Sequence, residues 1–219
     1  MWMNEGKSMS AVGMKRRDLL AHAKREFDLS VTEHEMTILR DDELYRHLRF
    51  RKPGTGLYGW DLITWPGHLV VTGDLESFHF AREEDMFGFF AGSGHKSEGG
   101  INPHYWGEKI QGTSQWREFS SEIFTQLIVE DFWERRHDYE GDVVELWRAI
   151  KDDVLDYAEY ESEARSALHN FRHRGLKGGD FEFYDTWEWS FMDYDVHYLR
   201  SLHAIVWGIA KYRAAKAQS

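Results

Sequence analysis

The chain has 219 residues, with 38 acidic and 27 basic side chains, a formal net charge of −11 and 42% apolar residues. This length and apolar content predict one globular domain or two small ones, and they exclude a wholly disordered protein. Because the sequence contains no cysteine, a disulfide scaffold, a cysteine nucleophile and a thiolate metal site are excluded as well.

The beginning of the chain does not have the pattern of a secretory signal. Met1–Gly13 mixes polar and charged residues and lacks an apolar central stretch, so residues 1–13 are predicted to be a disordered lead-in. The longest apolar runs, such as Ala204–Ala210, are far shorter than the roughly 18 to 20 residues that a membrane span requires. Together with the missing cysteines, these features favour a cytoplasmic protein that does not bind a membrane.

Residues 14–91 are predicted to form one helix followed by an antiparallel sheet. In Met14–Leu29 the apolar side chains recur at helical spacing, whereas from Met36 onward they alternate with a period of two, which is typical of strands. The expected strands are 36–39, 44–51, 58–65, 68–72 and 77–81. The turns between them are short, and Pro66-Gly67 suits the centre of a type II turn. Since parallel neighbours would need crossovers of about a dozen residues, the strands are expected to form a five-stranded antiparallel meander.

Residues 92–219 are predicted to be a mostly helical region that packs on this sheet and forms one compact unit with residues 14–91. A short helix is expected at Glu83–Phe90, and the glycine-rich passage Gly92–Gly100 is predicted to be a mobile loop or a boundary. The later helices are expected at 116–136, at 142–163, at 164–174, where the helix extends or follows the preceding one, and at 194–215. The predicted fold class is therefore α+β.

Negative charge is concentrated in two segments. Glu130–Glu163 carries 13 acids against four bases, and Asp180–Asp195 carries six acids and no base. On one acidic helix over residues 142–163, Asp152, Asp156 and Glu159 would share a face. A solvated face is the ordinary interpretation of such a run, and a partner surface is the functional one. Because nucleic-acid binding gains its affinity from basic surfaces, we expect no direct binding to nucleic acid.

The motifs of common enzyme classes are mostly absent, since the sequence has no phosphate-binding loop, no nucleophile elbow and no H-E-x-x-H helix. His169 and His173 are four residues apart and would share a helix face, but a third metal ligand is not evident. Asp193 and His197, at the start of the last helix, have the spacing of a general base and its orienting group, and a helix cap explains them equally. We therefore predict no catalytic residue, no metal and no cofactor.

Two further sets of residues have a functional and a structural interpretation. Asp61, Asp74 and Asp85 follow or precede turns, and they would approach a cation only if the meander brought those turns together. A sheet face that stacks nucleic-acid bases would use Tyr45, Arg49, Arg51, Tyr58 and Trp60. At least one aromatic set on these strands must instead fill the core.

The segment from Phe181 to Trp189 is rich in aromatic residues and carries acids but no base. Such a segment forms either the edge of a core or a protein-binding patch, because tryptophan and tyrosine dominate the binding energy of protein interfaces. Trp187 and Trp189 are therefore candidate partner-binding residues.

Several motifs occur in one order along most of the chain, from about Asp42 to Tyr212. They are YRHLRFR at 45–51, DLITWPGHL at 61–69, DMF with FF at 85–90, INP with YW at 101–106, WEW at 187–189 and WGI with a tyrosine at 207–212. In these motifs the sequence resembles a family of uncharacterised proteins encoded by phages and prophages. The resemblance implies a phage or prophage origin and action in the cytoplasm of the infected bacterium.

These observations favour a non-enzymatic phage accessory protein that binds and modulates a host protein. The target would be a bacterial defence complex, in the manner of an anti-CRISPR protein, or another complex that handles nucleic acid, contacted through an acidic surface. The residues expected at that surface are Asp152, Asp153, Asp156, Glu159, Glu161, Glu163, Trp187 and Trp189. The alternatives are a metal-dependent enzyme such as a nuclease, and a module that binds single-stranded nucleic acid.

Overall fold

The computed structural model describes residues 18–91, 100–176 and 179–218. The expected lead-in 1–13, the first residues of the expected helix 14–29 and most of the passage Gly92–Gly100 lie outside the described residues. The chain divides into two compact units. Among the described residues, the sheet unit comprises 18–91, 100–117 and 194–218, and the helical unit comprises 118–176 and 179–193.

The sheet unit contains the predicted five-stranded antiparallel meander. Its strands are β1 (Glu35–Asp42), β2 (Tyr45–Arg51), β3 (Trp60–Trp65), β4 (His68–Gly73) and β5 (Phe78–Ala81), and they lie in the order β1-β2-β3-β4-β5. Every neighbouring pair is antiparallel. Gly67 has a φ of 84°, as expected of the third residue of a type II turn between β3 and β4. The α+β fold class is confirmed.

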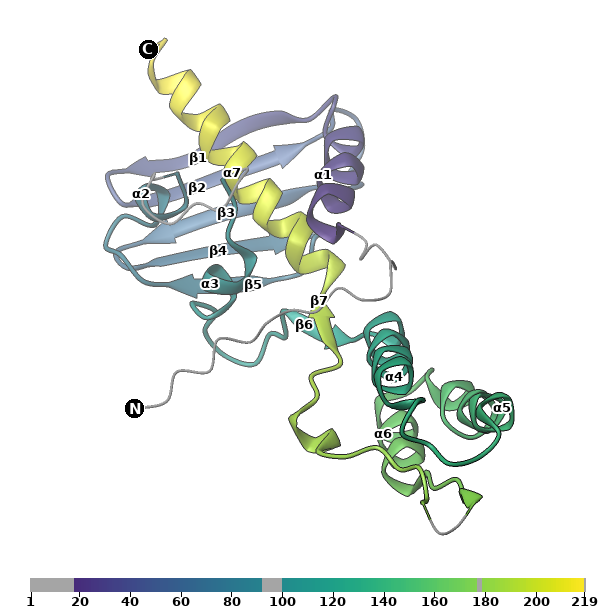
Figure 1. Ribbon diagram of the computed structural model, residues 1–219. Coiled ribbons are helices and arrows are strands. Elements are labelled where there is room, and N and C mark those ends of the chain that lie inside the picture. Colours follow the sequence, from purple (N-terminus) through teal and green to yellow (C-terminus); the bar gives the residue numbers. More distant parts are fainter. Residues whose placement is uncertain (1–17, 92–99, 177–178, 219) are drawn as a thin grey trace. The chain divides into compact units, whose positions relative to one another are not determined.

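Helices cover one face of this sheet. They are α1 (Leu19–Ser30), α2 (Met86–Ala91), α3 (Pro103–Gly107) and α7 (Val196–Lys216). Figure 1 shows α7 crossing the sheet on the same side as the other three helices. The strands turn alternate side chains toward these helices, so that Leu48, Phe50, Trp60 and Leu62 are fully buried. Phe27 of α1 completes this core by contacting the Trp60 ring edge-on, at a centroid distance of 5.7 Å.

A charged network joins the ends of α2 and α7 to the sheet. Arg46 of β2 donates from Nη1 to Asp85 Oδ1 at 2.8 Å, and its guanidinium lies 4.8 Å from the centre of the Phe87 ring. The Tyr212 hydroxyl donates to Asp41 Oδ1 at 2.7 Å. Burial raises the pKa of Asp85, but the hydrogen bond and the charge of Arg46 outweigh it and hold that pKa below its usual value.

The helical unit has a core of its own. It contains α4 (Ser121–Arg135), α5 (Val143–Asp153), the 3₁₀ turn η1 (Leu155–Tyr157), α6 (Glu161–Asn170) and the 3₁₀ turn η3 (Thr186–Glu188). The strands β6 (Arg117–Phe119) and β7 (Met192–Tyr194) pair with each other and carry the chain between the two units. The helices α4 to α6 pack their apolar sides together around Phe124, Ile128, Leu146 and Ile150.

This division differs from the expectation of one helical region, residues 92–219, packed on the sheet in one compact unit. Among the expected long C-terminal helices, α7 belongs to the sheet unit and contributes to its core. The helices α4 to α6 instead bury their apolar stripes against one another. Three amphipathic helices can bury these stripes mutually, and this satisfies the same hydrophobic pattern that predicted packing on a sheet.

The expected single acidic helix over residues 142–163 is wrong. Asp142 begins α5 as predicted, with its side chain accepting from Val144 N and Glu145 N, but the helix ends at Asp153 and α6 starts again at Glu161. Val154 and Ala164 are both fully buried in the same core. On one straight helix these two residues would lie about 15 Å apart along the axis. The break lets both reach the core.

Other helix ends also move from their expected positions. The first residues of the expected helix 116–136 form strand β6 instead. Helix α4 starts only after Ser120, whose Oγ accepts from Ile123 N at 3.2 Å. The expected helix 164–174 ends at Asn170 because Phe171 is extended. Asp195 caps α7 by accepting from Tyr198 N at 2.6 Å. Within the described ranges, none of the helices combines the length and apolar content that a bilayer crossing requires.

Candidate functional site

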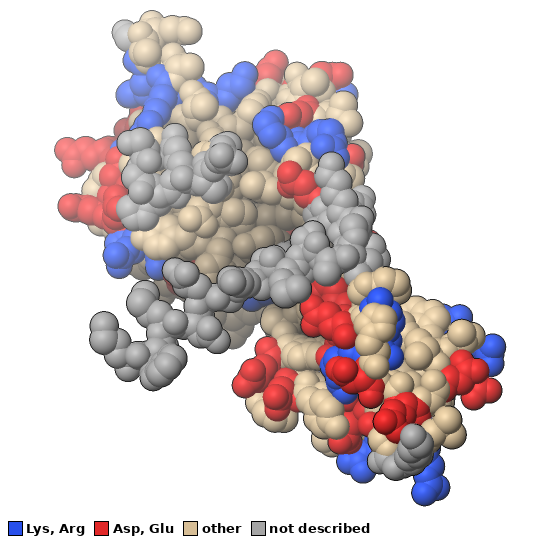
Figure 2. Space-filling model, in the orientation of Figure 1, with Lys and Arg blue, Asp and Glu red and all other residues tan. Residues whose placement is uncertain are grey.

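The whole net negative charge of the protein resides in the helical unit. Residues 118–193 contain 20 acids and 8 bases, a net charge of −12, whereas the rest of the chain carries +1. Figure 2 shows acidic side chains gathered over the helices of this unit. Charge of one sign at this density attracts basic surfaces over a Debye length, which is about 8 Å at physiological ionic strength.

The six acids predicted to bind a partner lie at the junction of α5, η1 and α6. They are Asp152, Asp153, Asp156, Glu159, Glu161 and Glu163, and all except Glu161 are exposed. The side chain of Glu161 accepts from Arg165 Nε at 2.9 Å. Because the helix breaks after Asp153, the expected common helix face of Asp152, Asp156 and Glu159 does not exist. The three acids lie instead on α5, on η1 and in the turn before α6.

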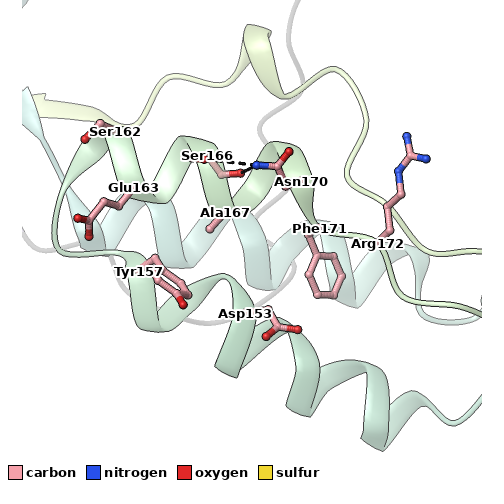
Figure 3. A pocket seen from close by; sticks show the side chains of 9 residues that line it. All are labelled: Asp153, Tyr157, Ser162, Glu163, Ser166, Ala167, Asn170, Phe171 and Arg172. Carbon is pink, nitrogen blue, oxygen red and sulfur yellow. Dashed lines mark hydrogen bonds between the residues drawn. The ribbon is translucent and has the colours of Figure 1, made fainter.

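The same junction forms a groove of about 650 Å³. Its lining residues are Asp153, Tyr157, Ser162, Glu163, Ser166, Ala167, Asn170, Phe171 and Arg172. Figure 3 shows that Asp153 and Tyr157 come from α5 and η1, whereas Glu163 and Ala167 come from α6 on the other side. Two of the six predicted acids therefore contribute to one concave surface.

The groove is rich in hydrogen-bond acceptors. Within the part of the chain that the structure describes, Asp153 and Glu163 form no ion pair. The Asn170 amide nitrogen donates to Ser166 O at 2.8 Å, which leaves its oxygen as an acceptor. The cation at the rim, Arg172, is paired through Nε with Glu182 at 3.1 Å. The free charge of the groove is negative.

The two tryptophans of the predicted patch have different surroundings. Trp187 lies on η3 and is 76% exposed. The preceding Asp185 adopts a left-handed backbone with a φ of 52°, which is uncommon for a residue other than glycine. Trp189 is half-buried and contacts Phe183 and Phe191 edge-on. Trp187 is thus available to a partner, whereas Trp189 forms part of the edge of the helical core.

Neither of the two pairs that involve a histidine, His169 with His173 and Asp193 with His197, lies on one helix. The expectation that His169 and His173 share a helix face is wrong, because α6 ends before His173. Nδ1 of His173 lies 2.7 Å from the Tyr139 hydroxyl. Asp193 belongs to strand β7, and His197 lies in the first turn of α7, which Asp195 caps.

The sheet carries a polar network that was not predicted from the sequence. Asp61 of β3 accepts from Arg49 Nε at 2.9 Å, from Arg49 Nη2 at 2.8 Å and from His47 Nε2 at 2.7 Å. Burial raises the pKa of Asp61, but these donors lower it overall. The alternation had placed His47 and Arg49 on one side of their strand, yet the register that pairs Arg49 with Asp61 could not be read from the sequence. With three donors on its carboxylate, Asp61 cross-links two strands.

A histidine pair lies on the same side of the sheet. His68 Nδ1 and His79 Nε2 are 3.0 Å apart, and the Trp65 ring stacks on His68 at a centroid distance of 4.9 Å. Burial, and then the charge of His68, lower the pKa of His79. This cluster had no signal in the sequence beyond the alternation of the strands.

The proposed base-stacking set does not form one surface. Trp60 is only 1% exposed and stacks on Phe50 inside the core, whereas Tyr58 is exposed and lies outside any strand. Arg49 is held by Asp61. A set that mixes core and surface residues cannot present a continuous stacking platform.

The three aspartates considered for a cation have separate structural roles. Asp61 binds the β2 side chains described above, Asp85 binds Arg46, and Asp74 Oδ2 accepts from Gly59 N at 3.2 Å. Among the described residues, no group of three or more acidic or histidine side chains is placed to hold a metal ion.

No protein-family model, curated protein or solved structure matches this chain. Its function must be inferred from its own charge distribution, groove and exposed side chains.

Proposed function

We propose that this protein is a non-enzymatic accessory protein that binds and modulates a basic host protein through its helical unit, in the bacterial cytoplasm. The phage or prophage setting comes from the resemblance described above. The observation that carries the proposal is the coincidence, in residues 118–193, of the entire net negative charge with a groove that two unpaired carboxylates line.

Charge and aromatic surface have separate roles in this proposal. Acidic side chains steer a basic partner and raise the association rate. Exposed aromatic side chains lengthen the lifetime of the complex, because aromatic anchors dominate interface energies. The helical unit has both, since Trp133, Tyr157, Tyr160, Tyr184 and Trp187 are exposed there.

The partner that fits this surface is a protein with a basic groove or patch. Proteins that handle nucleic acid have such surfaces, because they neutralise phosphates with lysine and arginine. Bacterial defence complexes and other nucleoprotein complexes belong to this class. A dense acidic surface competes with the phosphates for the same site, which is how binding would inhibit the partner.

Affinity capture from host lysate, followed by mass spectrometry, identifies the partner. The captured protein is then tested against a triple variant of the helical unit and a matched triple variant of the sheet unit. The two sets are Asp152→Asn, Asp156→Asn and Glu159→Gln, and Glu26→Gln, Glu83→Gln and Glu84→Gln. All six side chains are exposed, so both variants should fold.

We expect the helical-unit variant to associate roughly threefold more slowly or worse at low salt, and the sheet-unit variant to be close to wild type. The difference should shrink as salt increases. Equal association rates for the two variants at low salt would show that the acids of the helical unit are only a solvated surface.

A further inference from the structure

We infer that the groove between α5, η1 and α6 binds an arginine side chain, together with the short basic segment that carries it, from the protein partner. This inference rests on the proposed function and specifies its chemistry. The occupant is an arginine-containing peptide segment on the surface of a folded or unfolded protein.

The size of the groove sets the size of the occupant. Its volume of about 650 Å³ lies within the range of roughly 300 to 1,000 Å³ that is usual for ligand sites. This is more space than one side chain fills. Ser162, Ser166 and Ala167 are small, so the α6 wall leaves room for a peptide backbone beside the inserted side chain.

The charge of the groove requires a cationic occupant. Asp153 lines the groove from α5 and Glu163 lines it from α6, and neither carboxylate has an ion-pair partner among the described residues. Asp131 and Glu161 of the same unit are instead engaged by Arg135 and Arg165. An anionic or wholly apolar ligand would leave both groove carboxylates without compensation.

The aromatic side chains favour arginine over lysine. Tyr157 is 49% exposed and its ring lies in the space between η1 and α6 (Figure 3), whereas Phe171, further along the groove, is only 5% exposed. A guanidinium stacks on such a ring and still donates several hydrogen bonds to carboxylates, whereas an ammonium is a compact, strongly hydrated charge. The methylene stem of arginine would pack against Ala167.

The test uses two capped synthetic peptides, Gly-Arg-Gly-Arg-Gly and Gly-Lys-Gly-Lys-Gly, titrated into the full chain. Binding is measured by calorimetry, and the site is mapped by amide chemical shifts in NMR spectra. We expect the arginine peptide to bind about threefold tighter than the lysine peptide or better, with the largest shifts in residues 153–172. Largest shifts elsewhere, or equal affinity for the two peptides, would overturn the inference.

Two double variants separate the groove from the general negative charge. The groove variant is Asp153→Asn with Glu163→Gln, and the control is Glu134→Gln with Asp138→Asn, which removes the same charge at exposed positions outside the groove. We expect the groove variant to bind the arginine peptide roughly 5- to 30-fold more weakly and the control less than about twofold more weakly. A third variant, Tyr157→Leu, should reduce the preference for arginine over lysine.

The outcomes distinguish this inference from the proposed function. If the groove and control variants weaken peptide binding equally, the groove does not select the occupant, and the inference fails. The triple variant of Asp152, Asp156 and Glu159 leaves both groove carboxylates in place, so its effect on association with the captured partner tests the proposed function separately. NMR mapping of the unmodified protein tests the inference even if a variant does not fold.

Discussion

Gly208 provides the sharpest test of how closely α7 packs on the sheet. A Cβ atom at this position would lie 2.7 Å from Leu62 Cδ1 and 2.9 Å from Phe50 Cζ. Both neighbours are fully buried, and the Phe50 ring stacks on the ring of Trp60 in the next strand. The glycine therefore lets the helix backbone approach the core more closely than any other residue would allow.

Two opposing effects decide the outcome of Gly208→Ala. Alanine in a helix interior is more favourable than glycine by about 1 kcal/mol. Overpacking of a well-packed core costs typically 1 to 3 kcal/mol, and here the overlap with two immobile side chains is about 1 Å, so the cost lies in the upper part of that range. We expect a net loss in the free energy of unfolding of about 1 to 2 kcal/mol.

The matched control is Gly88→Ala in α2. There the nearest atom to the new Cβ is Asp85 Cβ at 4.0 Å, an ordinary contact distance. This variant should gain about 0.5 kcal/mol, since it keeps the helix preference and avoids the overlap. Urea unfolding, followed by tryptophan fluorescence and circular dichroism, measures the midpoint of each variant. If Gly208→Ala is stabilised as much as Gly88→Ala, α7 does not approach the sheet as described.

Three further predictions concern charge and capping. The pKa of Asp85 is held below its usual value, so its contribution to stability is present above about pH 4 and is lost as the pH falls through the lowered pKa. When unfolding is measured at decreasing pH, Asp85→Asn should therefore lose less stability than the wild type. An equal loss of stability in the two proteins would contradict the role of Arg46. Asp142→Ala should destabilise the helical unit by about 1 kcal/mol, and an unchanged unfolding midpoint would show that the cap at α5 is unimportant. Single-stranded oligonucleotides should bind weakly or not at all at physiological salt, because the net charge of the protein is −11. Submicromolar binding in a fluorescence anisotropy titration, lost in a variant with Arg49→Ala and Trp65→Ala, would refute this prediction and the proposed function.

The meander could be predicted from the sequence because its signals are local. Alternation of apolar side chains determines which residues of a strand face the core, and Pro66-Gly67 reverses the chain within two residues. The start of β3 differs from the expected strand 58–65 by two residues, and this difference also has a local cause. Tyr58 has a φ of 58° and therefore cannot belong to β3, which starts at Trp60.

The helix ends could be predicted only in part, because pairing between distant segments overrides local preference. Residues 117–119 and 192–194 lie at the edges of helical patterns, yet they pair with each other as β6 and β7. Hydrogen bonds between segments more than 70 residues apart in the sequence leave no periodic signal in either segment. The division into two units also depends on contacts between segments that are distant in the sequence.

The candidate site shows the same limit. Composition alone predicted the acidic segments Glu130–Glu163 and Asp180–Asp195 and the aromatic segment Phe181–Trp189, because counting residues requires no fold. The packing of the chain, which composition does not reveal, places Asp153 and Glu163 along one groove, leaves Trp187 exposed and puts Trp189 at the edge of the core. This arrangement arises because Val154 and Ala164 are buried in one core, so the helix breaks between them and α6 turns back beside α5. A periodic pattern indicates which face of a helix is apolar. The packing of the whole unit determines which surface covers that face.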